Sequence, residues 1–316
     1  MEFLTALLKS MPGAVGQGLI WGIMAIGVYI TYRILDVAYL TVDGSLATGG
    51  AACVLLALNG VNIWIATLCA ILAGMLAGLV TGLLHTRCGI PAILAGILTQ
   101  LALYSVNLRI MGWGTATGTQ ATLPIRVDNY ALLVSSRHIR AAGLNNPLFL
   151  LALLVAAVIA VLYWFFGTEL GCALRATGSN SSMSRAQGIN TDTTKVLGLM
   201  LSNGLVALSG ALLAQYQGSA TIDMGRRGAI VIGLAAVIIG QVLLSRIFHN
   251  FSLKLLSAVI GAIIYYMVIQ VVLRLGLDPN DLKLLTALVV AVFLSIPFWK
   301  SQYFTKAVHK GGTSHA

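Results

Sequence analysis

Residues 167–195 read GTELGCALRATGSNSSMSRAQGINTDTTK and interrupt the apolar second half of the chain. The flanking runs, 147–166 and 196–213, are apolar and close to the roughly 20 residues that cross a membrane as a helix. The segment itself holds two of the nine acidic and three of the nineteen basic residues. A compact polar segment between two such runs indicates a docking site on the water side, with the surrounding helices as the pathway that it controls.

The composition of the whole chain is that of an integral membrane protein. Of its 316 residues, 58% are hydrophobic and only 9% are charged, and the mean hydropathy is +0.92. Soluble domains carry about 25% charged residues, so this chain has too few to cover a water-facing surface. Continuous apolar runs predict helices. We therefore expect an all-α polytopic bundle of about nine transmembrane helices, one domain over residues 1–316, with one or more broken or re-entrant segments.

The net charge of +10 comes from basic residues scattered through short loops, which favours membrane lipid over nucleic acid as their partner. The lysines at 300, 306 and 310 favour a cytoplasmic C-terminus, because inner loops are enriched in basic residues. With nine spans this places residues 167–195, Arg87, Arg246 and Lys254 inside as well. Loops on the other side carry comparable charge, so the bias alone does not fix the orientation.

Residues 36–46, DVAYLTVDGSL, break a long apolar stretch. One interpretation is a solvated loop followed by a helix that Asp43 or Ser45 caps. The other is a broken helix at Asp43, Gly44 and Ser45, whose freed backbone lines a cavity near the substrate path. Both interpretations remain open at this stage.

Polar residues inside the apolar runs are the candidates for lining a pathway, because such groups face protein or water and not lipid. Gln100, Tyr104 and Asn107 follow one another at i, i+4 and i+7 and so share one helix face. Hydrogen bonding between helices is an equally good explanation for them. The complete candidate set is Gln100, Tyr104, Asn107, Asn203, Gln215 and Gln241. A separate run, Gly74-xxx-Gly78-xxx-Gly82, predicts close helix packing.

Several kinds of chemistry have no motif in this chain. It contains no GxxxxGK[ST] phosphate loop, no HExxH, no GxSxG and no CxxC. The four cysteines lack metal-ligand spacing, and the five histidines fall in loops or the tail. We therefore expect no catalytic residue, no metal site and no cofactor on this chain. If transport by this chain is active, its energy comes from another chain.

The polar segment resembles a known loop. Residues 171–180 read GCALRATGSN and Gly188-Ile-Asn190 follows, which is similar to the cytoplasmic loop of permeases in the branched-chain amino acid and ribose class of bacterial ABC importers. The stretches 40–46, LTVDGSL, and 208–214, LSGALLA, extend the resemblance over most of residues 14–300. Thr41 stands where the sugar-transporting members usually have serine, and Asp43 precedes the glycine, so this stretch departs from the sugar members. The chain as a whole resembles a branch associated with amino acid uptake, which implies an aromatic or branched-chain amino acid as solute.

The resemblance implies a permease of the bacterial inner membrane that pairs with a second copy and an extracytoplasmic solute-binding protein. It also implies two cytoplasmic ATPase subunits, which would bind ATP and magnesium. It also implies a short coupling helix within Arg175 to Arg185 that enters a cleft of the ATPase. The residues that this resemblance assigns to coupling are Arg175, Ala176, Thr177, Gly178, Ser179, Asn180, Arg185, Gly188 and Asn190.

Other functions stay open on sequence alone. The same class of importer could carry a sugar or another small solute, and an exporter of the same broad class would look similar. An ion-coupled secondary carrier needs buried acids, whereas Asp36 and Asp43 lie at the edge of a span. A membrane-embedded enzyme lacks a catalytic grouping here.

Overall fold

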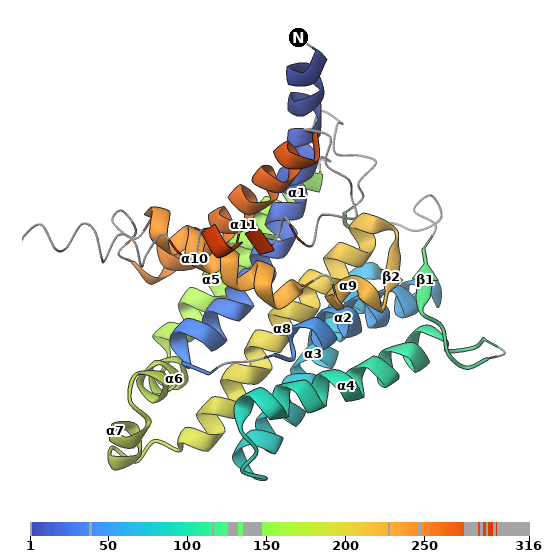
Figure 1. The fold of residues 1–316 in the computed structure, drawn as a ribbon. Helices are drawn as coiled ribbons and strands as arrows, with labels where there is room; N and C mark the ends of the chain where they lie inside the picture. The colour runs from blue at the N-terminus through green and yellow to red at the C-terminus, as the bar shows by residue number, and fades with distance from the viewer. Residues whose placement is uncertain are drawn as a thin grey trace, which may run out of the picture.

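The computed structural model describes residues 2–37, 40–115, 117–125, 132–134, 147–226, 228–244, 248 and 250–274, and seven residues between 284 and 295. The described chain is a helical bundle with one two-stranded sheet (Figure 1). Its elements are α1 (Glu2–Tyr29), η1 (Ile30–Ile34), α2 (Val42–Leu58), α3 (Ile63–Thr86), α4 (Ala92–Met111), β1 (Thr122–Pro124), α5 (Pro147–Gly167), α6 (Glu169–Ser179), α7 (Ser181–Ala186), α8 (Thr191–Gln217), β2 (Ser219–Thr221), α9 (Asp223–Arg226), α10 (Ala229–Leu244) and α11 (Phe251–Arg274).

The predicted all-α membrane fold is confirmed. Within the described residues, seven segments are long and apolar enough to cross a membrane: Ser10–Ile34, Ile63–Thr86, Ala92–Met111, Pro147–Gly167, Thr191–Gln217, Asp223–Leu244 and Phe251–Leu273. Helix α2 is a shorter apolar helix. These eight helices account for eight of the roughly nine predicted spans, and in the ninth, at 282–298, the structure describes seven residues, between 284 and 295. The predicted cytoplasmic C-terminus and Arg246 lie outside the described residues.

The first span ends in an interruption, not in a simple loop. Helix α1 passes into the π-helix η1, in which hydrogen bonds join residues five apart. Asp36 then adopts φ 52°, an uncommon conformation for a residue with a side chain. The chain re-enters helix as α2, whose 17 residues are mostly buried. This arrangement favours the broken-helix interpretation, since a span-length helix would need roughly 20 residues.

Helix α8 forms the centre of the bundle and packs most extensively against α3 and α2. Figure 1 shows it running diagonally through the molecule, with the α3–α4 turn and the α6–α7 segment together at its N-terminal end. Gly78 of α3 makes the closeness possible, because a Cβ atom there would lie 2.5 Å from the carbonyl oxygen of Leu199. Gly74 and Gly82 meet α8 one turn away on either side. The predicted close packing of the glycine run is therefore present.

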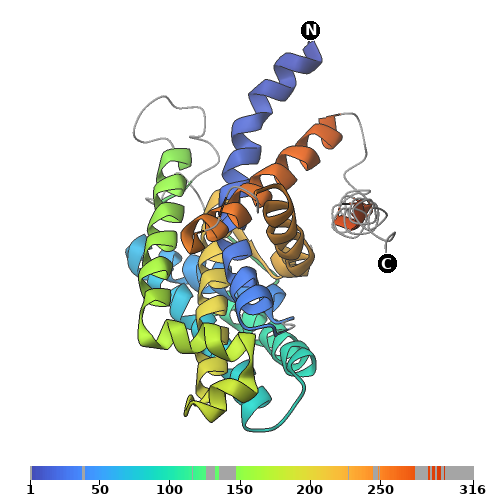
Figure 2. The same cartoon turned by 90° about the vertical axis from the view of Figure 1, so that its left-hand side faces the viewer.

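The outer helices expose apolar surface, as expected of a membrane domain. Helix α5 is mostly exposed and leads at its C-terminal end into α6, which turns across the base of the bundle (Figure 2). Large apolar side chains are also exposed along α3 and α4, among them Leu68, Leu72, Leu76, Leu94 and Leu98. The two short strands pair antiparallel beyond α4 and α8, with Leu123 opposite Ala220. Sequence reasoning missed this sheet.

Candidate functional site

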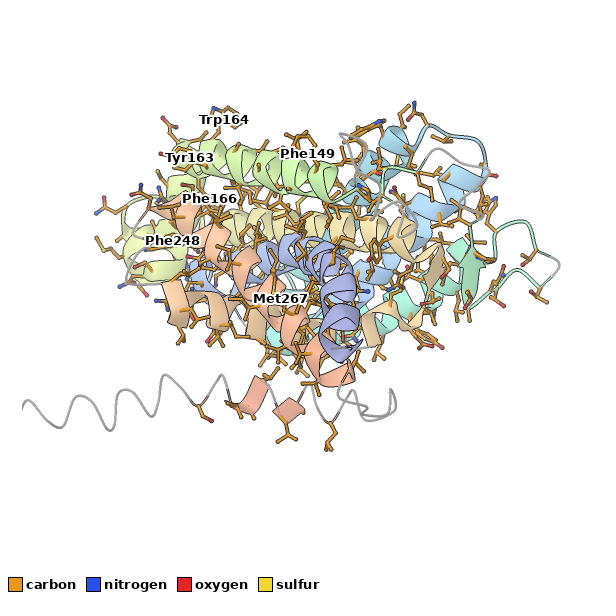
Figure 3. All side chains as sticks on the ribbon, turned by 90° about the horizontal axis from the view of Figure 1, so that it is seen from above. Phe149, Tyr163, Trp164, Phe166, Phe248 and Met267 are labelled. Atoms are coloured by element: carbon orange, nitrogen blue, oxygen red, sulfur yellow. The ribbon has the colours of Figure 1, made fainter. Side chains whose placement is uncertain are left out.

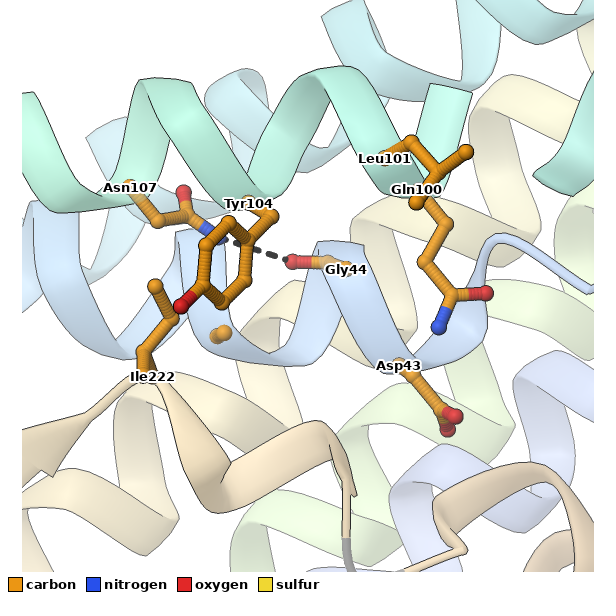
Figure 4. Close-up of a pocket in the computed structure, with 8 residues that line it drawn as sticks. Asp43, Gly44, Gln100, Leu101, Tyr104, Asn107 and Ile222 are labelled. Carbon is orange, nitrogen blue, oxygen red and sulfur yellow. Dashed lines mark hydrogen bonds between the residues drawn. The ribbon is translucent and has the colours of Figure 1, made fainter. Parts of the chain in front are cut away.

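A pocket of about 310 Å³ lies between the start of α2 and the middle of α4 (Figure 4). It is lined by Asp43, Gly44, Ala47, Gln100, Leu101, Tyr104, Asn107 and Ile222. Its volume is within the roughly 300–1,000 Å³ typical of small-molecule pockets. The structure therefore brings the three polar residues of α4 together with two residues of the predicted broken-helix region.

Two elements far apart in the sequence build this pocket. The α4 residues Gln100, Tyr104 and Asn107 project from one helix face toward the first turn of α2. The side-chain amide of Asn107 donates a hydrogen bond to the carbonyl oxygen of Gly44, 3.3 Å away. Gly44 permits the approach, because a Cβ atom there would lie 3.0 Å from the side chain of Leu103. The start of α2 and the polar face of α4 are thus held in contact.

Asp43 is the charged group of the pocket. Its carboxylate accepts a hydrogen bond from the backbone N–H of Ile230, 3.3 Å away, at the start of α10. A helix N-terminus carries partial positive charge, which stabilises a carboxylate beside it. Asp43 therefore caps a helix 187 residues away, whereas its own helix has Thr41 as N-cap without a side-chain bond. The interpretation of Asp43 or Ser45 as a cap of α2 is wrong, because both side chains bond to other helices.

The two ends of the pocket differ in character. Figure 4 shows Asp43 and Gln100 toward one end, and Tyr104, Asn107 and Ile222 toward the other. Tyr104 keeps 44% of its surface exposed, so its ring is accessible to a solute. Asn107 is 1% exposed, and its side-chain oxygen has no hydrogen-bond partner. The pocket offers an anionic group, amides and an aromatic ring, which suit a small polar solute with a cationic group.

Three other candidate residues do not line this pocket. Asn203 is fully buried in α8 and accepts a hydrogen bond from Ser45 at 2.5 Å. Gln215 is also fully buried and donates to the sulfur of Cys53 and the hydroxyl of Thr67. Gln241 is half-buried in α10. For Asn203 and Gln215 the geometry is that of hydrogen bonding between helices, the alternative explanation for polar groups in a span.

Sequence reasoning missed two features around the pocket. Ile222 reaches it from the connection between β2 and α9, and nothing in its local sequence marks it out. Three buried threonines also join α4 to its neighbours: the Thr41 hydroxyl, at the start of α2, donates to the Gly96 carbonyl of α4 at 3.2 Å, and the Thr81 hydroxyl of α3 donates to that of Thr99 in α4 at 2.9 Å. In the sequence, threonines within apolar runs are the feature that could have indicated these contacts between helices. Within the described residues, no group of three or more His, Cys, Asp or Glu side chains could hold a metal ion.

The polar segment 167–195 contains two helices where one was predicted between Arg175 and Arg185. Helix α6 continues through Gly178 and ends at Ser179, and α7 begins at Ser181. Asn180 ends the first and caps the second, accepting a bond from the backbone N–H of Met183 at 3.0 Å. An asparagine is among the best N-cap residues, which explains why a new helix starts here. The chain turns a corner inside the predicted coupling helix.

The two-helix segment contacts the rest of the bundle through α6. A Cβ atom on Gly178 would collide with the carbonyl oxygen of Ile34, so the backbones of α6 and η1 are in direct contact. The hydroxyl of Thr177 bonds to that of Thr194 in α8 at 3.0 Å. Asn190 caps α8 by accepting bonds from the backbone N–H groups of Asp192 and Thr193. Helix α6 is therefore in direct contact with both η1 and α8.

The remaining residues of the predicted coupling set lie on the outer side or at the ends of the segment. Ala176, Ser179 and Gly188 are exposed or half-exposed, and Gly188 adopts φ 82° in the turn before α8. Arg185 donates to the hydroxyl of Thr191 at 2.8 Å, which ties α7 to the start of α8. Arg175 instead donates to the carbonyl of Phe166 in α5 at 3.0 Å, away from α7.

A bundle of span-length helices, a broken helix beside a polar pocket and a helical segment on the water side define a membrane transport subunit. Its fold is similar to that of PsaBC from Streptococcus pneumoniae in complex with Fab, with TM-score 0.51, 18% identity, and coverage of 97% of this chain and 99% of that one. Residues 11–295 match the family described as branched-chain amino acid transport system / permease component. The chain belongs to this family, and so is a multi-pass permease of the ABC transporter class.

Curated relatives support the family and differ in solute. The chain is 41% identical over 279 residues to the tyrosine transport system permease protein of Clostridioides difficile (strain R20291), covering 88% of each chain. It is 33% identical to an uncharacterized protein of Rickettsia prowazekii (strain Madrid E), covering 89% of this chain and 95% of that one. It is 25% identical to the fructose import permease protein of Bifidobacterium longum (strain NCC 2705), covering 80% of this chain and 67% of that one.

Membership of this family identifies the chain as a transport subunit and not as the ATPase itself. A permease of this class works with an ATPase and with a solute-binding protein. The relatives carry different solutes, so the family alone does not assign one.

Proposed function

We propose that the chain is the permease of an ABC importer that carries an amino acid, and specifically an aromatic one, through the pocket between α2 and α4. The observation that carries this proposal is the placement of the Asp43 carboxylate and the Tyr104 ring around one cavity. A carboxylate pairs with the ammonium group of an amino acid, and a ring offers a face for an aromatic side chain. The tyrosine permease relative, at 41% identity, supports the same solute class.

The two-helix segment α6–α7 is the proposed docking site for a cytoplasmic ATPase. Met183 of α7 exposes 63% of its surface, although it is apolar and lies in the polar segment. An exposed methionine on a short helix suits a partner's hydrophobic cleft, because its flexible side chain adapts to the surface it meets. Coupling then involves the residues from Arg175 to Asn180 together with Arg185, Gly188 and Asn190. ATP and magnesium bind to the partner, and this chain carries out no chemical step.

A continuous set of contacts leads from this docking site to the pocket. Thr177 of α6 bonds to Thr194 of α8, and farther along α8 Asn203 bonds to Ser45 beside the pocket residue Gly44. When closure of the ATPase pair pushes α6–α7, α8 moves with it and shifts the start of α2. Two rigid arrangements of α2 against α4 would expose the pocket alternately to each side of the membrane.

The complete assembly that we propose is one transmembrane domain per chain, two copies of the chain, two ATPase subunits and an extracytoplasmic binding protein. In this orientation α6–α7 and the C-terminus face the cytoplasm of a bacterial cell. Arg87 and Lys254 lie near the same end of the bundle, since α3 ends beside the start of α8 and Phe251 of α11 contacts Phe166 of α5. Cross-linking of single-cysteine variants tests the homodimer.

The solute is tested by uptake into proteoliposomes that contain this permease, its ATPase and its binding protein. We expect ATP-dependent uptake of labelled tyrosine that unlabelled phenylalanine competes with and fructose does not. Uptake driven by a proton or sodium gradient without ATP would support an ion-coupled carrier instead. Efflux in place of uptake would support an exporter.

Asp43→Asn tests the pocket itself. Tyrosine uptake should fall about tenfold or more, because a hydrogen bond to a charged group contributes about 1.5–3 kcal/mol. Asp36→Asn is the matched control: it removes the same charge at an exposed position, and asparagine tolerates the φ of 52° found there. Equal uptake by the Asp43→Asn variant and the control would rule out a role for the carboxylate in solute recognition.

A further inference from the structure

A second pocket, of about 610 Å³, lies where α5 ends, α6 begins and α11 begins. Its lining includes the aromatic residues Tyr163, Trp164 and Phe251 and the polar residues Thr168, Arg175 and Asn250. None of these six residues lines the pocket between α2 and α4. The second pocket is therefore separate from the proposed solute path.

The position of this pocket is that of a membrane–water boundary. Two segments that can cross a membrane, Pro147–Gly167 and Phe251–Leu273, end and begin at it. Tyr163 is 59% exposed and Trp164 is 72% exposed in the last turns of α5, and Figure 3 shows both at the outer edge of that helix. Tyrosine and tryptophan gather at the level of lipid headgroups, because their rings are apolar and their tips are polar. The pocket thus opens at headgroup depth.

Arg175 gives this pocket a positive charge that the described part of the chain leaves unneutralised. One guanidinium nitrogen, Nη2, donates to the Phe166 carbonyl at 3.0 Å and to the Cys172 sulfur at 3.4 Å. The guanidinium carbon lies 5.8 Å from the centre of the Phe251 ring. These contacts orient the group but engage only one of its three nitrogens. A guanidinium has five N–H donors in a fixed fork, so donors remain for a ligand.

We propose that this pocket binds the phosphate headgroup of an anionic phospholipid from the leaflet that α6–α7 faces. A guanidinium fork matches phosphate oxygens geometrically and is more weakly hydrated than an ammonium group. The exposed Lys254 adds a second positive charge in the first turn of α11, the turn that contains the lining residue Phe251. The acyl chains of a lipid held here lie along the exposed apolar surface of α5. A bound headgroup bridges α5, α6 and α11 and steadies the base of the coupling segment.

Trp164 provides a direct measurement, since it lines the pocket. The permease is placed in nanodiscs of phosphatidylcholine that contain a small fraction of a brominated lipid, either phosphatidylglycerol or phosphatidylcholine. Bromine quenches tryptophan fluorescence at short range, and subtracting the signal of Trp164→Phe isolates the quenching of Trp164. Brominated phosphatidylglycerol should be enriched about fivefold over brominated phosphatidylcholine, the enrichment that one basic side chain provides at an anionic surface. Equal quenching by the two lipids would overturn the proposal.

Three variants test whether Arg175 causes the preference for phosphatidylglycerol. Arg175→Gln should abolish it, whereas Arg175→Lys should retain part of it because the charge stays. Arg87→Gln is the matched control, since it removes an exposed arginine at the same end of the bundle without touching this pocket. A preference that survives Arg175→Gln, or that Arg87→Gln removes equally, would contradict the assignment.

Adding inorganic phosphate distinguishes a site for lipid from a site for free phosphate. Excess inorganic phosphate should leave the enrichment of brominated phosphatidylglycerol intact. Loss of the enrichment in phosphate would show that the pocket takes free phosphate, which overturns the lipid assignment. These measurements use no solute and no ATPase, so their outcome is independent of the proposed amino acid transport.

Discussion

The hydroxyl of Ser45 donates a hydrogen bond to the side-chain oxygen of Asn203, 2.5 Å away, inside the fully buried contact between α2 and α8. The amide nitrogen of Asn203 in turn donates to the carbonyl of Leu199, one turn back along α8. Ser45 directly follows Gly44, which lines the pocket. This single bond therefore joins the central helix to the wall of the proposed solute path.

A double-mutant cycle measures the strength of that link. Ser45→Ala and Asn203→Ala should each destabilise the permease by about 1–3 kcal/mol, because each leaves a buried polar group without its partner or opens space. The coupling free energy between them should be about 0.5–3 kcal/mol, as for other residues in direct contact. Unfolding of the purified protein in detergent provides the free energies. Strict additivity would show that the bond contributes nothing.

Gly178→Ala tests whether α6 transmits movement to η1. The new methyl group collides with the carbonyl oxygen of Ile34, so α6 must move away from the end of the first span. Solute transported per ATP hydrolysed should fall about fivefold or more, the lower end of typical coupling free energies. Gly167→Ala is the matched control, since a Cβ atom there meets nothing within 4 Å. A normal transport-to-hydrolysis ratio in Gly178→Ala would count against the coupling role.

Asn107→Leu should separate stability from transport. The asparagine oxygen is buried without a partner, and its nitrogen makes one long bond of 3.3 Å, so a leucine of similar volume loses little. The free energy of unfolding should change by less than about 1 kcal/mol or increase, while uptake falls because a polar pocket wall has become apolar. Parallel thermal unfolding and uptake assays distinguish this from a purely structural role, in which both quantities would fall together.

The glycine contact between α3 and α8 makes a prediction about packing alone. Gly78→Ala places a methyl group 2.5 Å from the Leu199 carbonyl oxygen and should destabilise the protein by about 1–3 kcal/mol. Leu76→Ala, on the exposed face of the same helix, should change stability by less than about 0.5 kcal/mol. Unfolding free energies of the two variants in the same detergent provide the comparison. Similar losses would show that α3 and α8 separate to accept the methyl group.

Local sequence was sufficient for the fold class and for most spans. Apolar runs of membrane length and a glycine at every fourth position of α3 are visible without any knowledge of distant contacts. The shared face of Gln100, Tyr104 and Asn107 also follows from helix geometry alone. These predictions succeed because each depends on residues within a few turns of one another.

The remaining features of the site depend on contacts between residues far apart in the sequence, which local sequence does not reveal. Nothing near Asp43 reveals that its carboxylate caps α10, 187 residues away. Asn203 and Gln100 look alike as polar residues in apolar runs, yet one is buried against another helix and the other lines the pocket. Gly178 lies within α6, although glycine often ends a helix. The position requires glycine because the backbone of η1 passes too close for any side chain.

The contact between Gly178 and Ile34 consists of uncharged backbone atoms. The two contacts that join the coupling segment to the bundle therefore differ in how strongly they respond to ionic strength. The outer contact is the pair formed by Arg185 and Asp192, 3.8 Å apart and largely exposed, whose attraction dissolved salt screens. The inner contact has no charge to screen. Rising ionic strength should therefore weaken the Arg185–Asp192 attraction and leave the Arg185–Thr191 hydrogen bond to hold α7 at the start of α8, while the contact of α6 with the first span is unchanged.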